Sequence, residues 1–90
     1  MKKFMLDIQL EKLDHETRMK LLPREQEVVK ELEENGTIVA NYIKLDMSGI
    51  FIVMMAADTE DVHAILSTLP YYPYMKIEIT PVRVVNSINQ

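Results

Sequence analysis

The sequence of 90 residues contains no cysteine and no tryptophan, with only 2 glycines and 4 prolines. Without cysteine, the chain forms no disulfide bond, no cysteine-ligated metal site and no thiol nucleophile. The low glycine and proline content, together with 48% hydrophobic residues, is typical of a folded domain rather than a disordered chain. The length predicts one domain over residues 1–90, with a polar tail at 86–90.

Positive charge is also scarce, since 10 lysines and arginines face 14 acidic residues and leave a net charge of −4. Nucleic-acid binding needs a basic surface, so this balance disfavours it. No apolar stretch reaches the roughly 20 residues that cross a bilayer, and Asp7 and Gln9 interrupt the first apolar run. The two histidines, His15 and His63, lack partners at metal-ligand spacing. We expect a cytoplasmic protein that binds no cofactor, metal, membrane or nucleic acid.

Three stretches have the pattern of β-strands. Apolar and polar residues alternate over residues 3–10, as in a strand with one buried face. Residues 37–45 are rich in β-formers, and Asp46 to Gly49 form a hairpin connection in which the glycine can supply a positive φ. Residues 50–57 are apolar throughout, which predicts a central strand.

A helix is predicted between the first two strands, where Asp14 can cap a segment rich in helix formers. Pro23 complicates this segment, because a proline inside a helix removes a hydrogen bond and costs about 3 kcal/mol. We therefore expect a loose turn over residues 15–21 and a main helix that starts at Pro23. Asn35 and Gly36 end this helix, with one of them in the left-handed conformation.

The last third of the chain combines a capped helix, an aromatic turn and a strand. Asp58 is the predicted N-cap, and Pro70 marks the limit of the helix. The strand begins at Met75, where apolar and polar residues alternate again. The apolar stripe of the helix follows a period of 3.6 and consists of Val62, Ile65, Leu66 and Leu69.

The order strand, helix, strand, strand, helix, strand predicts a ferredoxin-like βαββαβ plait of class α+β, in which both helices cover one face of a four-stranded antiparallel sheet. The other face is then apolar in its centre and charged at its sides. Sheet-to-sheet dimerisation into an α/β barrel would bury this face, either around a ligand cavity or as a plain interface.

The last third also carries a family resemblance, in the segments VHAILSTLP and LPYYPYMKIEIT. A helix histidine, a Leu-Pro-aromatic-aromatic-Pro-Tyr-Met turn and an Ile-Glu-Ile-Thr strand resemble the muconolactone Δ-isomerase family. Weaker matches are Asp7 on the first strand, the pair Arg24 and Glu25, and Gly36. The resemblance implies barrel dimers, often assembled into larger rings, and a small organic ligand.

The activity implied by the resemblance moves a proton between two carbons of an unsaturated lactone that bears a carboxymethyl group. This reaction needs a base, a way to stabilise a dienolate and a cation for the substrate carboxylate. Several residues remain open for these roles. The candidate bases are Glu25, Glu78 and Asp7, and the candidate cations are Arg24, Lys44 and Lys76.

His63 is either a proton shuttle or a half-exposed helix residue that bonds to the backbone. Tyr42 and Tyr74 are candidate aromatic contacts for the ligand. A helix start at Pro23 would stabilise the charged form of Glu25 and lower its pKa, which argues against a base poised near neutral pH.

One departure from the family pattern divides the functional hypotheses. Ile43 stands where the resemblance implies an arginine. The protein is therefore either an isomerase that acts by proton transfer or a non-catalytic ligand-binding or assembly module that has lost the anion site. In the enzyme an acidic residue and a cation converge in one pocket, whereas in the module side chains fill that pocket.

Overall fold

The computed structural model describes residues 1–85, and its elements follow the predicted order; the predicted polar tail lies outside the described residues. The elements are β1 Lys2–Leu10, α1 His15–Glu34, β2 Ile38–Ile43, β3 Ile50–Ala56, α2 Thr59–Leu66, the 3₁₀ turn η1 Tyr72–Tyr74 and β4 Met75–Val82.

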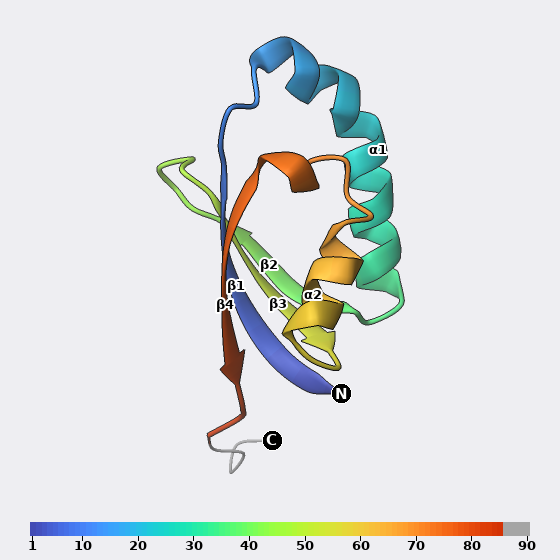
Figure 1. Ribbon diagram of the computed structural model, residues 1–90, viewed down its shortest axis with the longest axis vertical. Helices are drawn as coiled ribbons and strands as arrows, with labels where there is room; N and C mark the ends of the chain where they lie inside the picture. Colours follow the sequence, from blue (N-terminus) through green and yellow to red (C-terminus); the bar gives the residue numbers. More distant parts are fainter. Residues whose placement is uncertain (86–90) are drawn as a thin grey trace.

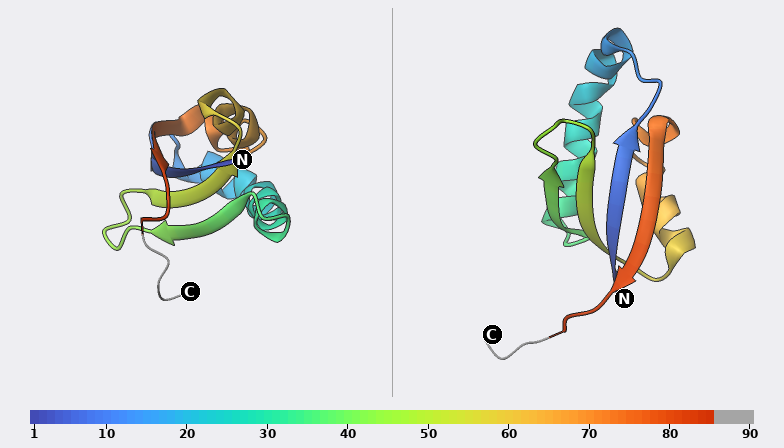
Figure 2. Two further views of the ribbon diagram at one scale, coloured as in Figure 1. Left: turned by 90° about the horizontal axis from the view of Figure 1, so that it is seen from below. Right: turned by 90° about the vertical axis from the view of Figure 1, so that its left-hand side faces the viewer.

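The four strands form one antiparallel sheet in the order β2-β3-β1-β4 (Figure 1). Both helices pack on the same face of this sheet, and the other face is left uncovered by the rest of the described chain (Figure 2). The predicted ferredoxin-like α+β fold is therefore confirmed. Its core consists of every second residue of the two central strands with the apolar stripes of the helices, and includes Phe4, Leu6, Ile8, Val28, Ile52, Met54, Val62 and Leu66.

Helix α1 is continuous from His15 to Glu34 and contains Pro23, so the predicted start at Pro23 is wrong. The real start is set by Asp14, whose Oδ1 accepts a 2.7 Å hydrogen bond from the backbone N–H of Thr17. Proline tolerates helical φ and removes the hydrogen bond to only one carbonyl, that of Met19. Pro23 and Met19 are both exposed, so water can satisfy this carbonyl. Gly36 ends the segment with φ of +83°, as predicted.

Helix α2 begins at Thr59 behind the N-cap Asp58, as predicted, but it already ends at Leu66. Two hydroxyl groups bond back to helix carbonyls at this end, from Ser67 to Ala64 and from Thr68 to Ile65. Such bonds offer the backbone an alternative to the next helical turn. The residues of the predicted apolar stripe still reach the core. Leu69 lies in the turn after the helix and is buried there.

The hairpin between β2 and β3 uses its glycine differently from the prediction. The positive φ belongs to Met47, at 65°, and not to Gly49. Gly49 lies against β1, where a Cβ atom would stand 2.3 Å from the carbonyl oxygen of Ile8. The sequence requires glycine here for close packing of two backbones and not for a left-handed turn.

Strand β3 lies inside the sheet, as its apolar sequence predicts, yet only one of its faces is covered. Ile52 and Met54 are buried beneath the helices, whereas Phe51, Val53 and Met55 face the other side and are half-buried or exposed. Across residues 1–85, neither helix is long and apolar enough to cross a membrane.

Candidate functional site

A cavity of about 480 Å³ lies between α1 and the helix-covered face of the sheet; we call it the α1 cavity. The helix contributes a single stripe to it, because its lining residues follow the spacing i, i+4, i+7, i+8, i+11. The lining consists of Arg18, Leu22, Glu25, Gln26 and Val29 from α1, Tyr71 and Met75 from the segment after α2, and Ile8, Leu10, Asn41, Ile43, Met47, Ser48, Gly49, Ile50 and Ile52 from the sheet and its hairpin.

Glu25 is the acidic group of this cavity and, among residues 1–85, the one charged residue that is buried, with 8% of its surface exposed. Its Oε1 accepts a 2.9 Å hydrogen bond from the backbone N–H of Tyr71. Burial raises the pKa of the Glu25 carboxyl, and the hydrogen bond from Tyr71 opposes this only in part. The expectation of a pKa lowered by a helix N-terminus is wrong, because the helix begins at His15 and Glu25 lies in its interior.

Tyr71 connects Glu25 with the backbone of Arg18, the residue whose guanidinium is the cation of the cavity. Its hydroxyl donates a 2.9 Å hydrogen bond to the backbone carbonyl of Arg18, and only 6% of its surface is exposed. Burial raises the pKa of the phenol, the negative charge of Glu25 raises it further, and the positive charge of Arg18 opposes both. A carboxyl, a guanidinium and a neutral phenol therefore lie around the same cavity.

The remaining walls are suited to a small organic molecule with few polar groups. Ile8, Ile50, Ile52 and Met75 give an apolar floor, while the amides of Gln26 and Asn41 and the hydroxyl of Ser48 provide hydrogen-bonding groups. Within residues 1–85 no cluster of three metal-ligating side chains is found. The buried carboxyl of Glu25 can exchange a proton, and the guanidinium of the exposed Arg18 can bind an anion, so the cavity holds groups for acid–base chemistry on a carboxylated molecule.

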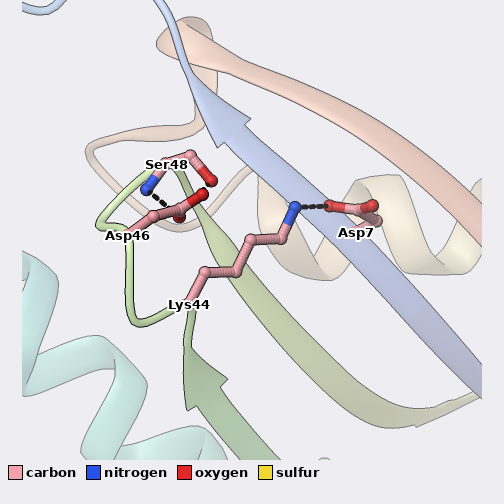
Figure 3. A network of polar contacts seen from close by, with 4 residues as sticks. All are labelled: Asp7, Lys44, Asp46 and Ser48. Carbon is pink, nitrogen blue, oxygen red and sulfur yellow. Dashed lines mark hydrogen bonds and ion pairs between the residues drawn. The ribbon is translucent and has the colours of Figure 1, made fainter.

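A second group of charged residues lies on the opposite, uncovered face of the sheet. Nζ of Lys44 lies 3.0 Å from Oδ1 of Asp7 (Figure 3). The same Nζ lies 4.8 Å from the centre of the Phe51 ring. Asp7 also faces Glu78 across the β1–β4 ladder. Beside Asp7 and Lys44 lies a hollow of only about 100 Å³, which we call the sheet-face hollow. It is lined by Asp7, Gln9, Lys76 and Glu78.

The structure thus separates the candidate residues that the sequence suggested. Glu25 lines the α1 cavity, whereas Asp7, Lys76 and Glu78 line the sheet-face hollow beside Lys44. The other four candidates line neither the α1 cavity nor the sheet-face hollow. Arg24 is exposed and pairs with Glu27, and Nδ1 of His63 lies 2.9 Å from the hydroxyl of Tyr72. Tyr42 is 63% exposed, and Tyr74 lies in η1.

Arg18 and Tyr71 are cavity residues that sequence reasoning did not select. Arg18 precedes Glu25 by seven residues, which places both on one helix face. The predicted helix start at Pro23 concealed this relationship, because Arg18 then fell in an irregular turn. Tyr71 could be found only as one of several neighbouring tyrosines, since its position in the sequence does not show which aromatic ring turns inward.

Comparison with known proteins gives two positive results and one negative result. The family model described as muconolactone delta-isomerase matches residues 3–87. A crystal structure of muconolactone isomerase at 3.3 Å resolution superimposes with a TM-score of 0.80 and 24% sequence identity, covering 96% of this chain and 94% of that chain. Among curated proteins, no sequence matches the chain. The structural similarity extends over nearly the whole chain and therefore describes its complete fold.

Proposed function

Because the chain belongs to the muconolactone delta-isomerase family, we propose that it is a small-molecule isomerase that transfers a proton on an unsaturated lactone or carboxylate in the α1 cavity. The observation that carries the proposal is the convergence of Glu25, Arg18 and Tyr71 on this cavity. A non-catalytic module would have its pocket filled by side chains, whereas about 480 Å³ remains open here.

In the proposed reaction Glu25 is the base. Its Oε1 is held by the Tyr71 N–H, which leaves Oε2 to accept a proton from the saturated ring carbon next to the C=C–C=O unit of the lactone. The electron pair of the broken C–H bond moves into the conjugated system and gives a dienolate. The protonated Glu25 then returns the proton to another carbon of that system. The transfer is redox-neutral and needs no co-reactant.

Burial supports the role of Glu25, since a carboxylate with a raised pKa is a stronger base than one in water. Asp7 and Glu78 are weaker candidates on physical grounds. Asp7 is paired with Lys44, and Glu78 is exposed on the rim of a hollow of about 100 Å³. Such a hollow is small compared with the several hundred Å³ of ordinary ligand pockets.

Arg18 is proposed as the partner of the substrate carboxylate. It lines the cavity on the same helix face as Glu25, whereas the side chain of Arg24 is occupied by Glu27. A guanidinium binds a carboxylate through two parallel hydrogen bonds and so fixes its orientation. This assignment also offers a substitute for the arginine that the family resemblance implied at Ile43.

We also propose that the uncovered sheet face associates with a second copy of the chain. Its centre carries Met5, which is 43% exposed, and Phe51, which is 37% exposed, next to the half-buried Val53 and Met55. An apolar centre with charged sides is typical of an interface. Phe51→Asp should shift the protein from dimer or larger ring to monomer in analytical ultracentrifugation. Met19→Asp adds the same charge at an exposed position of α1, away from the sheet face, and should leave the assembly unchanged.

The proposed reaction is tested by incubating the protein with muconolactone in D₂O and following the ligand by ¹H NMR. Deuterium uptake and conversion to the isomeric lactone are expected. Glu25→Gln should lower the rate by a factor of about 10² to 10⁴, the usual contribution of a general base. Glu31→Gln removes an exposed carboxylate from the same helix and should leave the rate unchanged. Equal rates in Glu25→Gln and wild type would refute the assignment of the base.

A further inference from the structure

Helix α1 carries a proline between the two residues assigned to base and cation. Pro23 lies between Arg18 and Glu25, and it cannot donate a hydrogen bond to the carbonyl of Met19. Helices bend most readily where a proline interrupts this ladder. Without a further contact, the position of Arg18 relative to Glu25 would vary with the bend.

Tyr71 supplies contacts on both sides of this point. Its backbone N–H donates to Oε1 of Glu25 at 2.9 Å, and its hydroxyl donates to the carbonyl of Arg18 at 2.9 Å. The two partners are 46 and 53 positions away in the sequence, so both bonds are tertiary. The residue is 6% exposed and therefore well packed. A tyrosine has only two side-chain torsions, and a buried ring restricts both.

From these contacts we infer that Tyr71 is a positioning residue, which fixes the distance between the substrate carboxylate bound by Arg18 and the carboxylate of Glu25. The inference rests on the proposed function. Tyr71 acts through its neighbours, since its hydroxyl is already donated to the Arg18 carbonyl. Its two bonds have separable effects, because one comes from the backbone and survives any substitution of the side chain except proline.

The test compares Tyr71→Phe with Tyr72→Phe. Both variants lose one phenol hydroxyl, but that of Tyr72 bonds to the exposed His63 outside the cavity. In Tyr71→Phe, KM for muconolactone should rise about fivefold, the worth of one ordinary hydrogen bond, with a smaller change in kcat. The pH dependence of kcat should stay the same, because the N–H bond to Glu25 remains. Tyr72→Phe should match wild type in every parameter.

A second readout does not depend on catalysis. Amide hydrogen exchange of residues 18–22 should accelerate about fivefold in Tyr71→Phe relative to residues 26–32, since the first part of α1 loses its tertiary bond. Unchanged KM and unchanged exchange in this variant would overturn the inference. If wild-type protein does not convert muconolactone, the proposed substrate fails, and the exchange measurement alone decides whether Tyr71 fixes the helix.

Discussion

The backbone N–H of Tyr71 donates a 2.9 Å hydrogen bond to the buried carboxylate of Glu25, and so joins the middle of the first helix to the turn that precedes the last strand. This contact places an ionisable group with a raised pKa beside a cavity and ties it to a rigid part of the fold. The proposed chemistry depends on this arrangement, and several of its consequences can be measured.

The first prediction concerns the pH dependence of stability. Burial raises the pKa of Glu25 in the folded protein above its ordinary value of 4.5. Below that value the carboxyl is protonated in both the folded and the unfolded protein. As the pH rises toward and through the folded pKa, the unfolded chain releases its proton first, so the free energy of unfolding decreases. Glu25→Gln should therefore be more stable than wild type at about pH 7 but not at about pH 4 in urea denaturation. A Glu31→Gln control should show no such difference, and a destabilised Glu25→Gln at neutral pH would contradict the prediction.

The two glycines should respond to alanine for different reasons. In Gly49→Ala the new methyl group would stand 2.3 Å from the carbonyl oxygen of Ile8, so β1 or the hairpin must shift, at an expected cost of about 1–3 kcal/mol. In Gly36→Ala the space is open and only the left-handed φ is strained, at about 1 kcal/mol. Chemical denaturation measures both. A smaller loss for Gly49→Ala than for Gly36→Ala would show that the backbones separate easily.

Replacing the helix proline should stabilise the protein. Pro23→Ala restores a donor for the carbonyl of Met19, which should stabilise the folded protein by up to about 3 kcal/mol. The substitution also raises the conformational entropy of the unfolded chain, which reduces this gain by up to about 1 kcal/mol. A net gain of about 1–2 kcal/mol in the free energy of unfolding is expected. Pro73→Ala serves as the control, because Pro73 lies at the start of η1, where no donor is missed. A loss of stability in Pro23→Ala would indicate that the proline shapes α1 for packing.

The pair Asp7 and Lys44 on the uncovered face should contribute to stability rather than to catalysis. Their side chains are 38% and 22% exposed, so a double-mutant cycle with Asp7→Asn and Lys44→Met should give a coupling of about 0.5–1 kcal/mol, reduced at about 1 M salt. Asp7→Asn should keep the isomerisation rate within about threefold of wild type, in contrast to Glu25→Gln. A loss of rate as large as that of Glu25→Gln would move the site to the sheet face.

The sequence alone determined the order of the elements and therefore the fold. Alternation of apolar residues in β1 and β4, the acidic caps Asp14 and Asp58, and the stop at Gly36 are local signals that act through backbone geometry and short-range hydrogen bonds. Such signals need no knowledge of distant residues. The alternation also places the apolar residues of β1 and β4 on one face of the sheet, because side chains of a strand alternate strictly between its faces.

The tertiary structure decided what local signals could not. Pro23 can lie inside α1 because the carbonyl of Met19, which it leaves without a donor, is on an exposed part of the helix. The role of Gly49 depended on how closely the backbone of β1 approaches it. The candidate site was decided in the same way. The burial that raises the pKa of Glu25, and the contacts of Tyr71 with Glu25 and Arg18, join residues far apart in the sequence. Burial and long-range hydrogen bonds are properties of the packed chain, and no pattern of neighbouring residues specifies them.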